Sequence, residues 1–164
     1  MPAPRQSASL PVFVVLGTYN GARYLFEFAE SVRRQSYTDW KMLVRDDASS
    51  DATGSMLRQL AAEEERFVVL PNDSTRCGPA KNYATLLQRA YDLGAEYVLL
   101  ADQDDVWLKE KILKQMDLMR GTEAATASET PILVYTDLTV VDAGLRTIHG
   151  SFFRHARFYR GDHE

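Results

Sequence analysis

The chain has 164 residues and a mass of 18.5 kDa, a size typical of a single domain. Hydrophobic residues make up 45% and charged residues 26%, which excludes an intrinsically disordered chain. Lys and Arg number 19 against 23 Asp and Glu, and this acidic balance argues against a nucleic-acid-binding protein. The single cysteine excludes an internal disulfide, and no apolar run approaches the ~20 residues of a membrane-spanning helix.

Apolar, β-branched segments alternate along the chain with segments of helical periodicity. Continuous apolar runs predict buried strands, and apolar residues three or four positions apart predict amphipathic helices. The expected strands are Val12–Leu16, Trp40–Val44, Phe67–Leu70, Tyr97–Ala101 and Ile132–Tyr135. The expected helices are Ala22–Gln35, Ala52–Glu64, Pro79–Leu93 and Leu108–Met119, the last of them ended by Gly121.

This alternation predicts an α/β fold with a mostly parallel sheet and helices on both of its faces. Because the acidic strand ends must meet at a switch point, we expect the strand order 3-2-1-4 in the first half. The segment Gly121–Pro131 is expected to be an exposed loop. We predict a leader over residues 1–10, one domain over residues 11–150 that is incomplete at its C-terminus, and a tail over residues 151–164.

The predicted strands end in acidic or polar residues, at the edge where open α/β sheets bind their ligands. Gly17–Gly21 follows the first strand, Asp46 and Asp47 the second, Asp102 to Asp105 the fourth, and Asp137 the fifth. Clustered carboxylates repel one another unless a cation neutralises them, and a set of oxygen ligands suits Mg²⁺ or Mn²⁺. These strand ends therefore predict a site for a metal-bound diphosphate.

Each acidic group also has a purely structural interpretation. Asp104 or Asp105 is suited to cap the following helix, and the pair after the second strand is suited to end that strand in a turn. Gly17 and Gly21 match neither the dinucleotide-binding pattern nor the P-loop pattern, which disfavours both kinds of site.

Four motifs, in order, resemble family 2 glycosyltransferases of the GT-A fold. They are Val12–Asn20 (VFVVLGTYN), Val44–Thr53 (VRDDASSDAT), Asn72 with Cys77–Asn82 (CGPAKN), and Leu100–Trp107 (LADQDDVW). The last of them, together with Tyr135–Asp142 (YTDLTVVD), most resembles the rhamnosyltransferase-like branch. The resemblance extends from Val12 to about Phe153, which is nearly the whole chain.

The resemblance implies transfer of a sugar, with rhamnose as a candidate, from a dTDP- or UDP-linked donor to an acceptor hydroxyl, with inversion. The implied donor-binding residues are Thr18, Tyr19 and Asn20 in the nucleotide pocket, Asp46 or Asp47 at the base or ribose, and Lys81 near the diphosphate. Asp102-Gln103-Asp104 would be the metal-binding DxD element. Within it, Asp104 would ligate Mg²⁺ or Mn²⁺ directly, and Asp102 would be a second ligand that lies nearer the ribose.

The resemblance also implies what the chain lacks. In this family the general base comes from the second half of the protein, so we expect it beyond residue 164. The chain would then be the donor-binding part, which does not transfer sugar at an appreciable rate by itself. The implied acceptor is a glycan or a lipid-linked glycan of cell-surface polysaccharide assembly, in the cytoplasm at the inner face of the membrane. Peripheral membrane association and a homodimer are further expectations, the latter because Phe152, Phe153, Phe158 and Tyr159 are expected to be exposed.

Two other functions compete with this interpretation. A non-catalytic nucleotide-sugar-binding or assembly module would have no acidic base beyond residue 164 in the parent reading frame. A sugar-nucleotide pyrophosphorylase would have a glycine-rich loop with a basic residue after the first strand. Gly17–Arg23 matches the pattern of that loop only in part, so the sequence disfavours the pyrophosphorylase.

Overall fold

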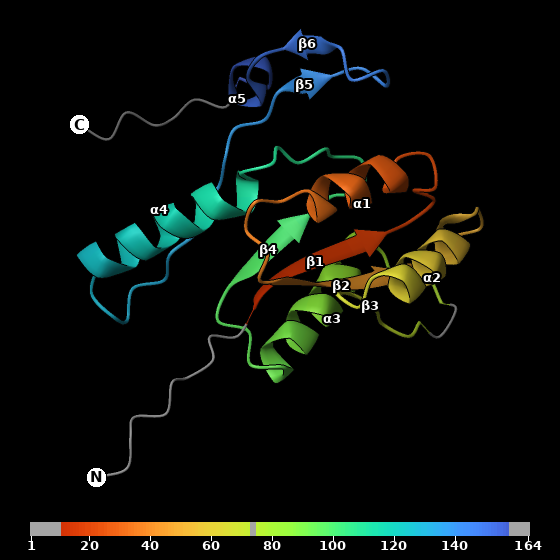
Figure 1. Cartoon of the computed structure of the whole chain (residues 1–164), viewed down its shortest axis with the longest axis horizontal. Coiled ribbons are helices and arrows are strands. Elements are labelled where there is room, and N and C mark those ends of the chain that lie inside the picture. Colours follow the sequence, from red (N-terminus) through yellow and green to blue (C-terminus); the bar gives the residue numbers. More distant parts are fainter. Residues whose placement is uncertain (1–10, 73–74, 158–164) are drawn as a thin grey trace. The chain divides into compact units, whose positions relative to one another are not determined.

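The computed structural model describes residues 11–72 and 75–157, and the chain divides into two compact units, residues 1–113 and 114–164 (Figure 1). The predicted leader, and the part of the predicted tail after residue 157, lie outside the described residues. The first unit contains a four-stranded sheet, and the second contains a two-stranded hairpin.

A parallel sheet forms the centre of the first unit. Its strands are β1 (Val12–Thr18), β2 (Trp40–Asp46), β3 (Phe67–Val69) and β4 (Val98–Ala101). The order β3-β2-β1-β4 confirms the predicted order 3-2-1-4. The register pairs Thr18 with Asp46, and Leu16 with Ala101. Because the paired strands all run parallel, their carboxyl ends meet at one edge of the sheet.

Helices cover both faces of this sheet, as predicted. They are α1 (Leu25–Arg33), α2 (Thr53–Glu63) and α3 (Pro79–Asp92). Helix α3 buries Leu86 and Ala90 against Phe13, Val15 and Leu43 of the central strands. Helix α1 lies on the opposite side of the sheet and contacts α2 (Figure 1). The side chains of β1 are therefore buried on both faces, which is why this strand reads as an unbroken apolar run.

Helix α3 begins immediately after Gly78, whose backbone angles restrict this position to glycine. Its φ of 82° and ψ of 163° lie in a region that other residues occupy only under strain. A Cβ at Gly78 would meet no atom within 4 Å, so backbone strain alone opposes a larger residue.

We expect Gly78→Ala to lower the free energy of unfolding by about 1–3 kcal/mol, because alanine is strained at this φ. Urea denaturation measures the difference. Gly54→Ala within α2 is the matched control, since a Cβ there meets only the end of the Arg58 side chain, at 3.6 Å. The control should leave stability unchanged or raise it, because alanine is the better helix former. Equal stability of the two variants would contradict the strain at Gly78.

Helix α4 (Lys111–Ala125) begins later than the predicted residue Leu108. The side chain of Gln35 holds the segment that precedes the helix. Its Nε2 donates to the carbonyl of Leu108 at 2.8 Å, and its Oε1 accepts from the backbone N–H of Ile112 at 3.1 Å. This contact joins residues far apart in the sequence, so the helical periodicity alone did not reveal where the helix begins.

The prediction that Gly121 ends α4 is wrong, and so is the start of the predicted loop Gly121–Pro131, because the helix continues to Ala125. A single glycine inside a helix costs only about 1 kcal/mol relative to alanine. The hydroxyl of Thr122 donates to the carbonyl of Leu118 at 2.8 Å within the same helix. Ala124 and Ala125 follow in the same helix, and alanine is the residue with the highest helix propensity.

The second unit differs from the sequence-based prediction. Strands β5 (Val140–Val141) and β6 (Thr147–His149) pair antiparallel, and the short helix α5 (Phe152–His155) follows them. The predicted strand Ile132–Tyr135 is wrong, since this run forms no strand and Leu133 is 82% exposed. An apolar, β-branched run becomes a strand only where a neighbouring strand supplies hydrogen bonds, and within residues 11–72 and 75–157 no strand pairs with this run.

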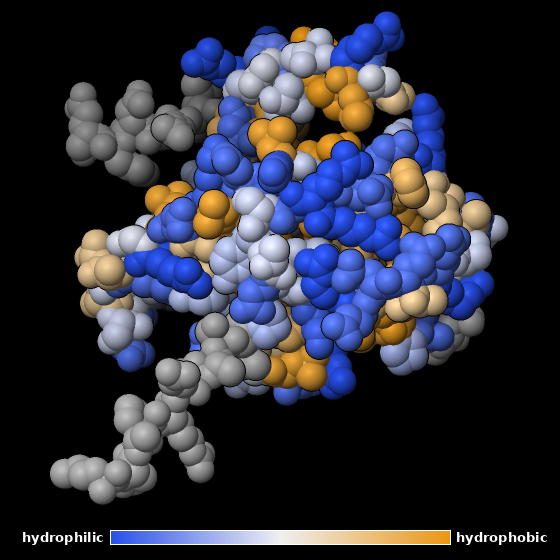
Figure 2. All heavy atoms as spheres, viewed as in Figure 1, coloured by the Kyte–Doolittle hydropathy of each residue, from blue (hydrophilic) through white to orange (hydrophobic). Residues whose placement is uncertain are grey.

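The face drawn in Figure 2 is mostly hydrophilic, with hydrophobic residues exposed in separate groups. Of the aromatic residues predicted to be exposed, Phe152 is exposed and Phe153 is half-buried, with its ring 5.9 Å from that of Tyr135. Phe158 and Tyr159 lie outside the described residues. In the described ranges, no helix has both the length and the apolar character that crossing a membrane requires.

Candidate functional site

The loops that follow β1 and β2 are joined by hydrogen bonds at the carboxyl edge of the sheet. The Thr18 hydroxyl, which is buried, donates to Asp46 Oδ1 at 2.9 Å. The backbone N–H of Asn20 donates to Ser49 Oγ at 2.8 Å, and Asn20 Oδ1 accepts from the N–H of Ser50 at 2.9 Å. Asn20 has a φ of 48°, a left-handed conformation that Asn adopts more readily than most residues. The structure therefore brings Thr18, Asn20 and Asp46 together.

Asp47 is only 3% exposed and holds the loop that precedes α3. Its carboxylate accepts the backbone N–H groups of Cys77 and Gly78, each at 2.8 Å, and the Cys77 thiol at 3.1 Å. Burial alone would raise the pKa of Asp47. These hydrogen bonds and the charge of Arg45, 3.9 Å away, lower the pKa by more than burial raises it. The net result is a pKa below the usual value for Asp. The carboxylate is therefore ionised and engaged inside the protein.

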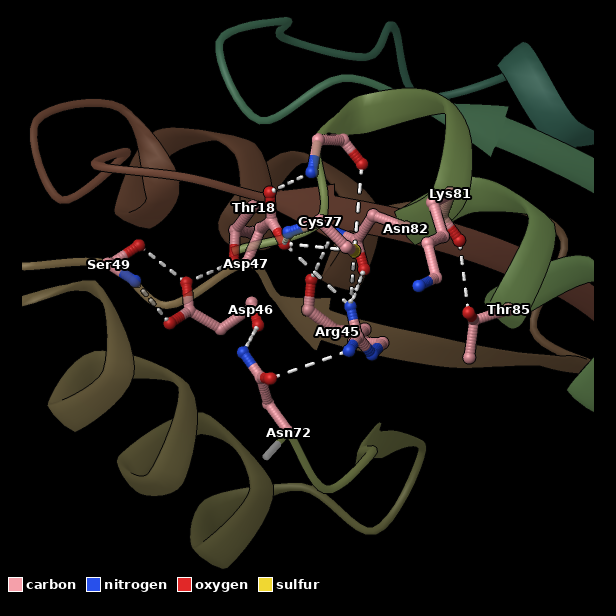
Figure 3. Close-up of polar contacts among 11 residues, drawn as sticks. Thr18, Arg45, Asp46, Asp47, Ser49, Asn72, Cys77, Lys81, Asn82 and Thr85 are labelled. Carbon is pink, nitrogen blue, oxygen red and sulfur yellow. Dashed lines mark hydrogen bonds and ion pairs between the residues drawn. The ribbon is translucent and has the colours of Figure 1, made fainter. Parts of the chain in front are cut away.

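Arg45 connects the end of β2 to the start of α3 (Figure 3). Its guanidinium donates to Asn82 Oδ1 at 2.8 Å and to Asn72 Oδ1 at 3.4 Å, and it contacts Cys77 Sγ at 3.2 Å. Asn82 returns a hydrogen bond from Nδ2 to the Arg45 carbonyl at 2.9 Å. The guanidinium is nearly buried and faces Asp47 in the same cluster. This network stabilises the loop that carries Cys77 and Gly78.

The turn after β4 presents two exposed carboxylates, Asp102 and Asp104. The hydroxyl of Tyr83 in α3 has two acceptors within reach of its one proton, the Ala101 carbonyl at 2.5 Å and Asp102 Oδ1 at 3.1 Å. Burial raises the pKa of Tyr83 above its usual range, and the charge of Asp102 raises it further. Burial also raises the pKa of half-buried Asp105, to which the charges of Asp102 and Asp104 contribute, while Lys111 acts in the opposite direction. The three neighbouring aspartates therefore repel one another.

This donor set suits a divalent cation that is shared with a phosphate. Within the described ranges, no group of three or more His, Cys, Asp or Glu side chains is arranged to hold a metal ion. Mg²⁺ commonly binds to only one or two carboxylates and takes its other ligands from substrate phosphates and water. The exposed oxygens of Asp102 and Asp104 fit that mode, and a cation there would relieve the repulsion at Asp105. Neither Asp104 nor Asp105 caps α4, which begins at Lys111, so the capping interpretation is wrong.

Tyr19 joins the β1 end of the site to the β4 end. Its backbone N–H donates to Gln103 Oε1 at 3.1 Å, and its carbonyl accepts from Gln103 Nε2 at 3.0 Å. Tyr19 is 37% exposed, and the guanidinium of Arg76 lies over its ring, 3.9 Å from the ring centroid. The site therefore includes an exposed aromatic ring beside a cation, next to the acidic turn.

Lys81 lies at the start of α3, and its side chain is exposed. It lines an open cavity of about 650 Å³ together with Leu70, Pro71 and Arg89. The residues around this cavity include none of the aspartates at the strand ends. We therefore define the candidate site by the polar strand ends rather than by this cavity.

Asp137, expected at the same edge, lies in the second unit. Its carboxylate accepts from Ser151 Oγ and from the backbone N–H groups of Leu138 and Phe153. These bonds, of which the one from Ser151 is the strongest influence, lower the pKa of Asp137. It therefore fastens the segment before β5 to the start of α5.

Sequence reasoning missed the residues that act through hydrogen bonds rather than through charge. The members of this group are Asn72, Asn82, Tyr83 and Gln103. Each belongs to a segment that the prediction had singled out, but no single residue type among them signals its partner. Arg45 lies within the motif Val44–Thr53, and the sequence did not indicate its partners Asn82, Asn72 and Cys77.

Comparison with known proteins places the chain in a family. Residues 13–157 match the family described as "Glycosyl transferase family 2". TuaG of Bacillus subtilis, named for teichuronic acid biosynthesis, is 33% identical over 132 residues, which are 80% of this chain and 50% of TuaG. The dTDP-rhamnosyl transferase RfbG of Shigella flexneri is 27% identical over 121 residues, covering 73% of this chain and 42% of RfbG. The chain thus spans about half the length of the curated relatives it matches.

Two solved structures have the same fold over most of this chain. One is the mannosyltransferase PcManGT of Pyrobaculum calidifontis in complex with GDP-Man and Mn²⁺, with a TM-score of 0.55 and 28% identity. The match covers 68% of this chain and 32% of PcManGT. The other is S. aureus TarS 1-349 in complex with UDP, with a TM-score of 0.59 and 22% identity, covering 80% and 41%. With this GT-A fold, and with the family match over residues 13–157, the chain belongs to glycosyl transferase family 2.

Proposed function

We propose that this chain binds the nucleoside-diphosphate sugar of a glycosyltransferase at the carboxyl ends of β1, β2 and β4. The observation that carries the proposal is the turn after β4, where Asp102 and Asp104 expose their carboxylates beside Tyr19. A similarly folded mannosyltransferase binds GDP-Man and Mn²⁺, which supports the same class of ligand here. The complete protein would transfer the sugar to an acceptor hydroxyl, with inversion.

Asp104 would ligate Mg²⁺ or Mn²⁺ directly, with Asp102 as the second ligand. The metal, when bound, acts as a Lewis acid that stabilises the negative charge developing on the leaving diphosphate. The protein's own contribution is positional, since the Tyr83 hydroxyl lies 2.5 Å from the Ala101 carbonyl and 3.1 Å from Asp102 Oδ1 and so anchors the start of the acidic turn. Half-buried Asp105 adds a negative charge that favours binding of a cation.

The other residues assigned to donor binding fall into two groups, those with exposed side chains and those with buried ones. Tyr19 is partly exposed and the Arg76 guanidinium covers one face of its ring, so we propose that the uncovered part of the ring contacts a nucleobase. Asn20 and Asp46 take part in the hydrogen bonds that join the loops after β1 and β2, next to Tyr19. Thr18 and Asp47 are buried, so we propose that they act by holding those loops in place. A role for Lys81 at the diphosphate requires its flexible side chain to turn from the open cavity that it lines.

The donor is proposed to be dTDP- or UDP-linked, with rhamnose as a candidate sugar, because RfbG is a dTDP-rhamnosyl transferase. A lipid-linked acceptor is proposed because the relative WfgD of Escherichia coli is named for a diphosphoundecaprenol acceptor. The location at the inner face of the membrane is a further proposal. The general base is proposed to lie beyond residue 164, and association into a homodimer remains a prediction.

A thermal-shift panel tests the donor site. Sugar nucleotides of UDP, dTDP and GDP are each added with Mn²⁺ and with excess EDTA. We expect one nucleotide class to raise the unfolding midpoint with Mn²⁺ and to lose most of that effect in EDTA, since ligands stabilise the state they bind. Equal stabilisation in EDTA would remove the metal from the proposal. Stabilisation by none of the three would contradict nucleotide-sugar binding.

Turnover is a separate test of the proposed position of the base. A positioned general base contributes ~10²- to 10⁴-fold to the rate, so this chain alone should bind donor without steady transfer. Steady sugar transfer that Asp137→Asn abolishes would place the base inside this chain. A longer chain from the parent reading frame that also lacks turnover would favour the non-catalytic module.

A further inference from the structure

The Gln103 side chain makes two hydrogen bonds to one residue on a different strand end. Gln103 Oε1 accepts from the Tyr19 N–H at 3.1 Å, and Gln103 Nε2 donates to the Tyr19 carbonyl at 3.0 Å. A primary amide presents a donor and an acceptor side by side, as a backbone peptide group does. The side chain therefore satisfies both backbone polar groups of Tyr19.

These two bonds continue the contact between β1 and β4 beyond the end of the sheet. The paired residues of these strands end at Leu16 and Ala101. Gln103 lies two residues beyond Ala101 and engages Tyr19, three residues beyond Leu16. The loop after β1 is thus fastened to the acidic turn after β4.

Gly21 provides the space that this arrangement needs. A Cβ built on Gly21 would lie 2.1 Å from Gln103 Oε1 and 2.4 Å from Gln103 Cδ. No φ in the left-handed range requires glycine there, so the close approach of Gln103 is the restraint. The position of the Gln103 amide therefore depends on the absence of a side chain at Gly21.

We propose that Gln103 is a positioning residue, which holds Tyr19 and the flanking Asp102 and Asp104 in their ligand-binding arrangement before the ligand arrives. This inference rests on the proposed function, in which the two carboxylates bind the metal and Tyr19 contacts the nucleotide. Both hydrogen bonds lie at the exposed rim of the site rather than in the core. Their loss therefore loosens the site without removing core packing.

Two variants that break the same contact from opposite sides test the proposal. Gln103→Met keeps the approximate shape of the side chain but removes both hydrogen bonds. Gly21→Ala leaves Gln103 unchanged and displaces its amide by the steric clash. Gly54→Ala is the matched control, because a Cβ at Gly54 meets only Arg58, at 3.6 Å. Gln103→Ala and the double variant Gly21→Ala/Gln103→Ala complete the set, because neither has an amide that a Cβ at residue 21 could displace.

Two measurements on the full 164-residue chain read out the effect. The first is hydrogen exchange of the Tyr19 amide by NMR without ligand, which should become faster in both single variants. The second is calorimetric affinity for UDP, dTDP and GDP with Mn²⁺, which should fall by about tenfold, the size typical of supporting residues around a metal. In Gln103→Met, which changes a partly exposed side chain, the unfolding midpoint should shift by less than about 2 °C. Gly21 is buried, so the affinity of Gly21→Ala is compared with that variant's own shift in the midpoint.

The outcomes separate this inference from the proposed function. Unchanged Tyr19 exchange, or unchanged nucleotide affinity in Gln103→Met, would overturn the positioning role. In Gln103→Met, a fall in affinity that follows a matching fall in the unfolding midpoint would also overturn it, in favour of a merely structural role. A double variant much weaker than Gln103→Ala alone would show that Gly21 does not act through Gln103. If the wild-type chain binds none of the nucleotides, the proposed function fails and the positioning role toward a nucleotide fails with it. Faster Tyr19 exchange would then still establish the contact itself.

Discussion

Asp104→Asn is expected to weaken binding of UDP or dTDP in the presence of Mn²⁺ by about 100-fold, the upper end of effects seen around metal sites. Asn keeps the size of the side chain and one oxygen but removes the negative charge that a hard divalent cation prefers. Asp104 is exposed, and its charge contributes to the raised pKa of Asp105. The substitution should therefore weaken metal binding without weakening the fold.

Asp105→Asn is the matched comparison, because it removes the same charge from the neighbouring position. Asp105 is half-buried, and its pKa is raised by burial and by the charges of Asp102 and Asp104. A carboxyl whose folded pKa is raised destabilises the folded protein when it ionises, so this variant should be slightly more stable at neutral pH. Its nucleotide affinity should fall less than that of Asp104→Asn.

Isothermal titration calorimetry with and without excess EDTA distinguishes the two carboxylates. With Mn²⁺, the two variants should differ clearly, whereas in EDTA both should resemble the wild-type chain. Equal losses in the two variants would mean that the cluster acts only through its total charge. A larger loss in Asp105→Asn would assign the direct ligand to Asp105 instead of Asp104.

The sheet was predictable because the sequence patterns that indicate it, apolar runs alternating with helical segments, are local and repeated along the chain. Unbroken apolar runs such as Val12–Leu16 indicate strands buried on both faces, and the intervening helices require parallel crossovers. The acidic strand ends then favour the order that places them at one edge, and the structure has that order. Pro79 and Gly94 likewise marked the ends of α3, since proline suits the first helical position and Gly94 follows the helix with a φ of 79°.

The details that were not predictable depend on contacts between distant segments. Ile132–Tyr135 has the composition of a strand, but in the described part of the chain it has no strand beside it to pair with. The end of α4 was misplaced because one glycine, Gly121, was given more weight than the residues that follow it. The bonds of Gln103 to Tyr19 join residues more than 80 positions apart. A sequence pattern identifies such residues as polar but does not identify their partners.

Asp47 shows the same limit for a single residue. Its position after β2 indicated a strand-end carboxylate, for which the family resemblance implied a contact with the base or ribose. In the structure the carboxylate is buried and accepts from Cys77 and Gly78. The partners come from a loop about 30 positions away, and without them an exposed and a buried aspartate have the same sequence signature.

Asp47→Asn is expected to lower the free energy of unfolding by about 2–4 kcal/mol at neutral pH. The amide presents its NH₂ group to one of the backbone N–H donors of Cys77 and Gly78, which then loses its acceptor. The substitution also removes the negative charge 3.9 Å from the nearly buried guanidinium of Arg45. The hydrogen bonds from Arg45 to Asn82 and Asn72 remain, which keeps the loss below that of a completely isolated buried charge.

The pH dependence of this loss gives the sharper test. The pKa of Asp47 lies below its usual value in the folded protein, so the ionised carboxylate stabilises the fold. That contribution is complete above the unfolded-state pKa of about 3.9, and it disappears as the pH falls through the lower folded-state value. The difference in unfolding free energy between the wild-type chain and Asp47→Asn should therefore be constant near neutral pH and shrink below about pH 4.

Urea denaturation across this pH range measures the difference, with Asp51→Asn as the control. Asp51 also accepts backbone N–H groups, from Thr53 and Ala22, and its pKa is also lowered, chiefly by the Thr53 hydroxyl. It is exposed, however, so water can replace its lost bonds and the substitution should cost much less. Equal losses in the two variants would show that burial and the Arg45 charge add nothing to Asp47. A loss in Asp47→Asn that stays constant down to low pH would show that the carboxylate's ionisation does not stabilise the fold.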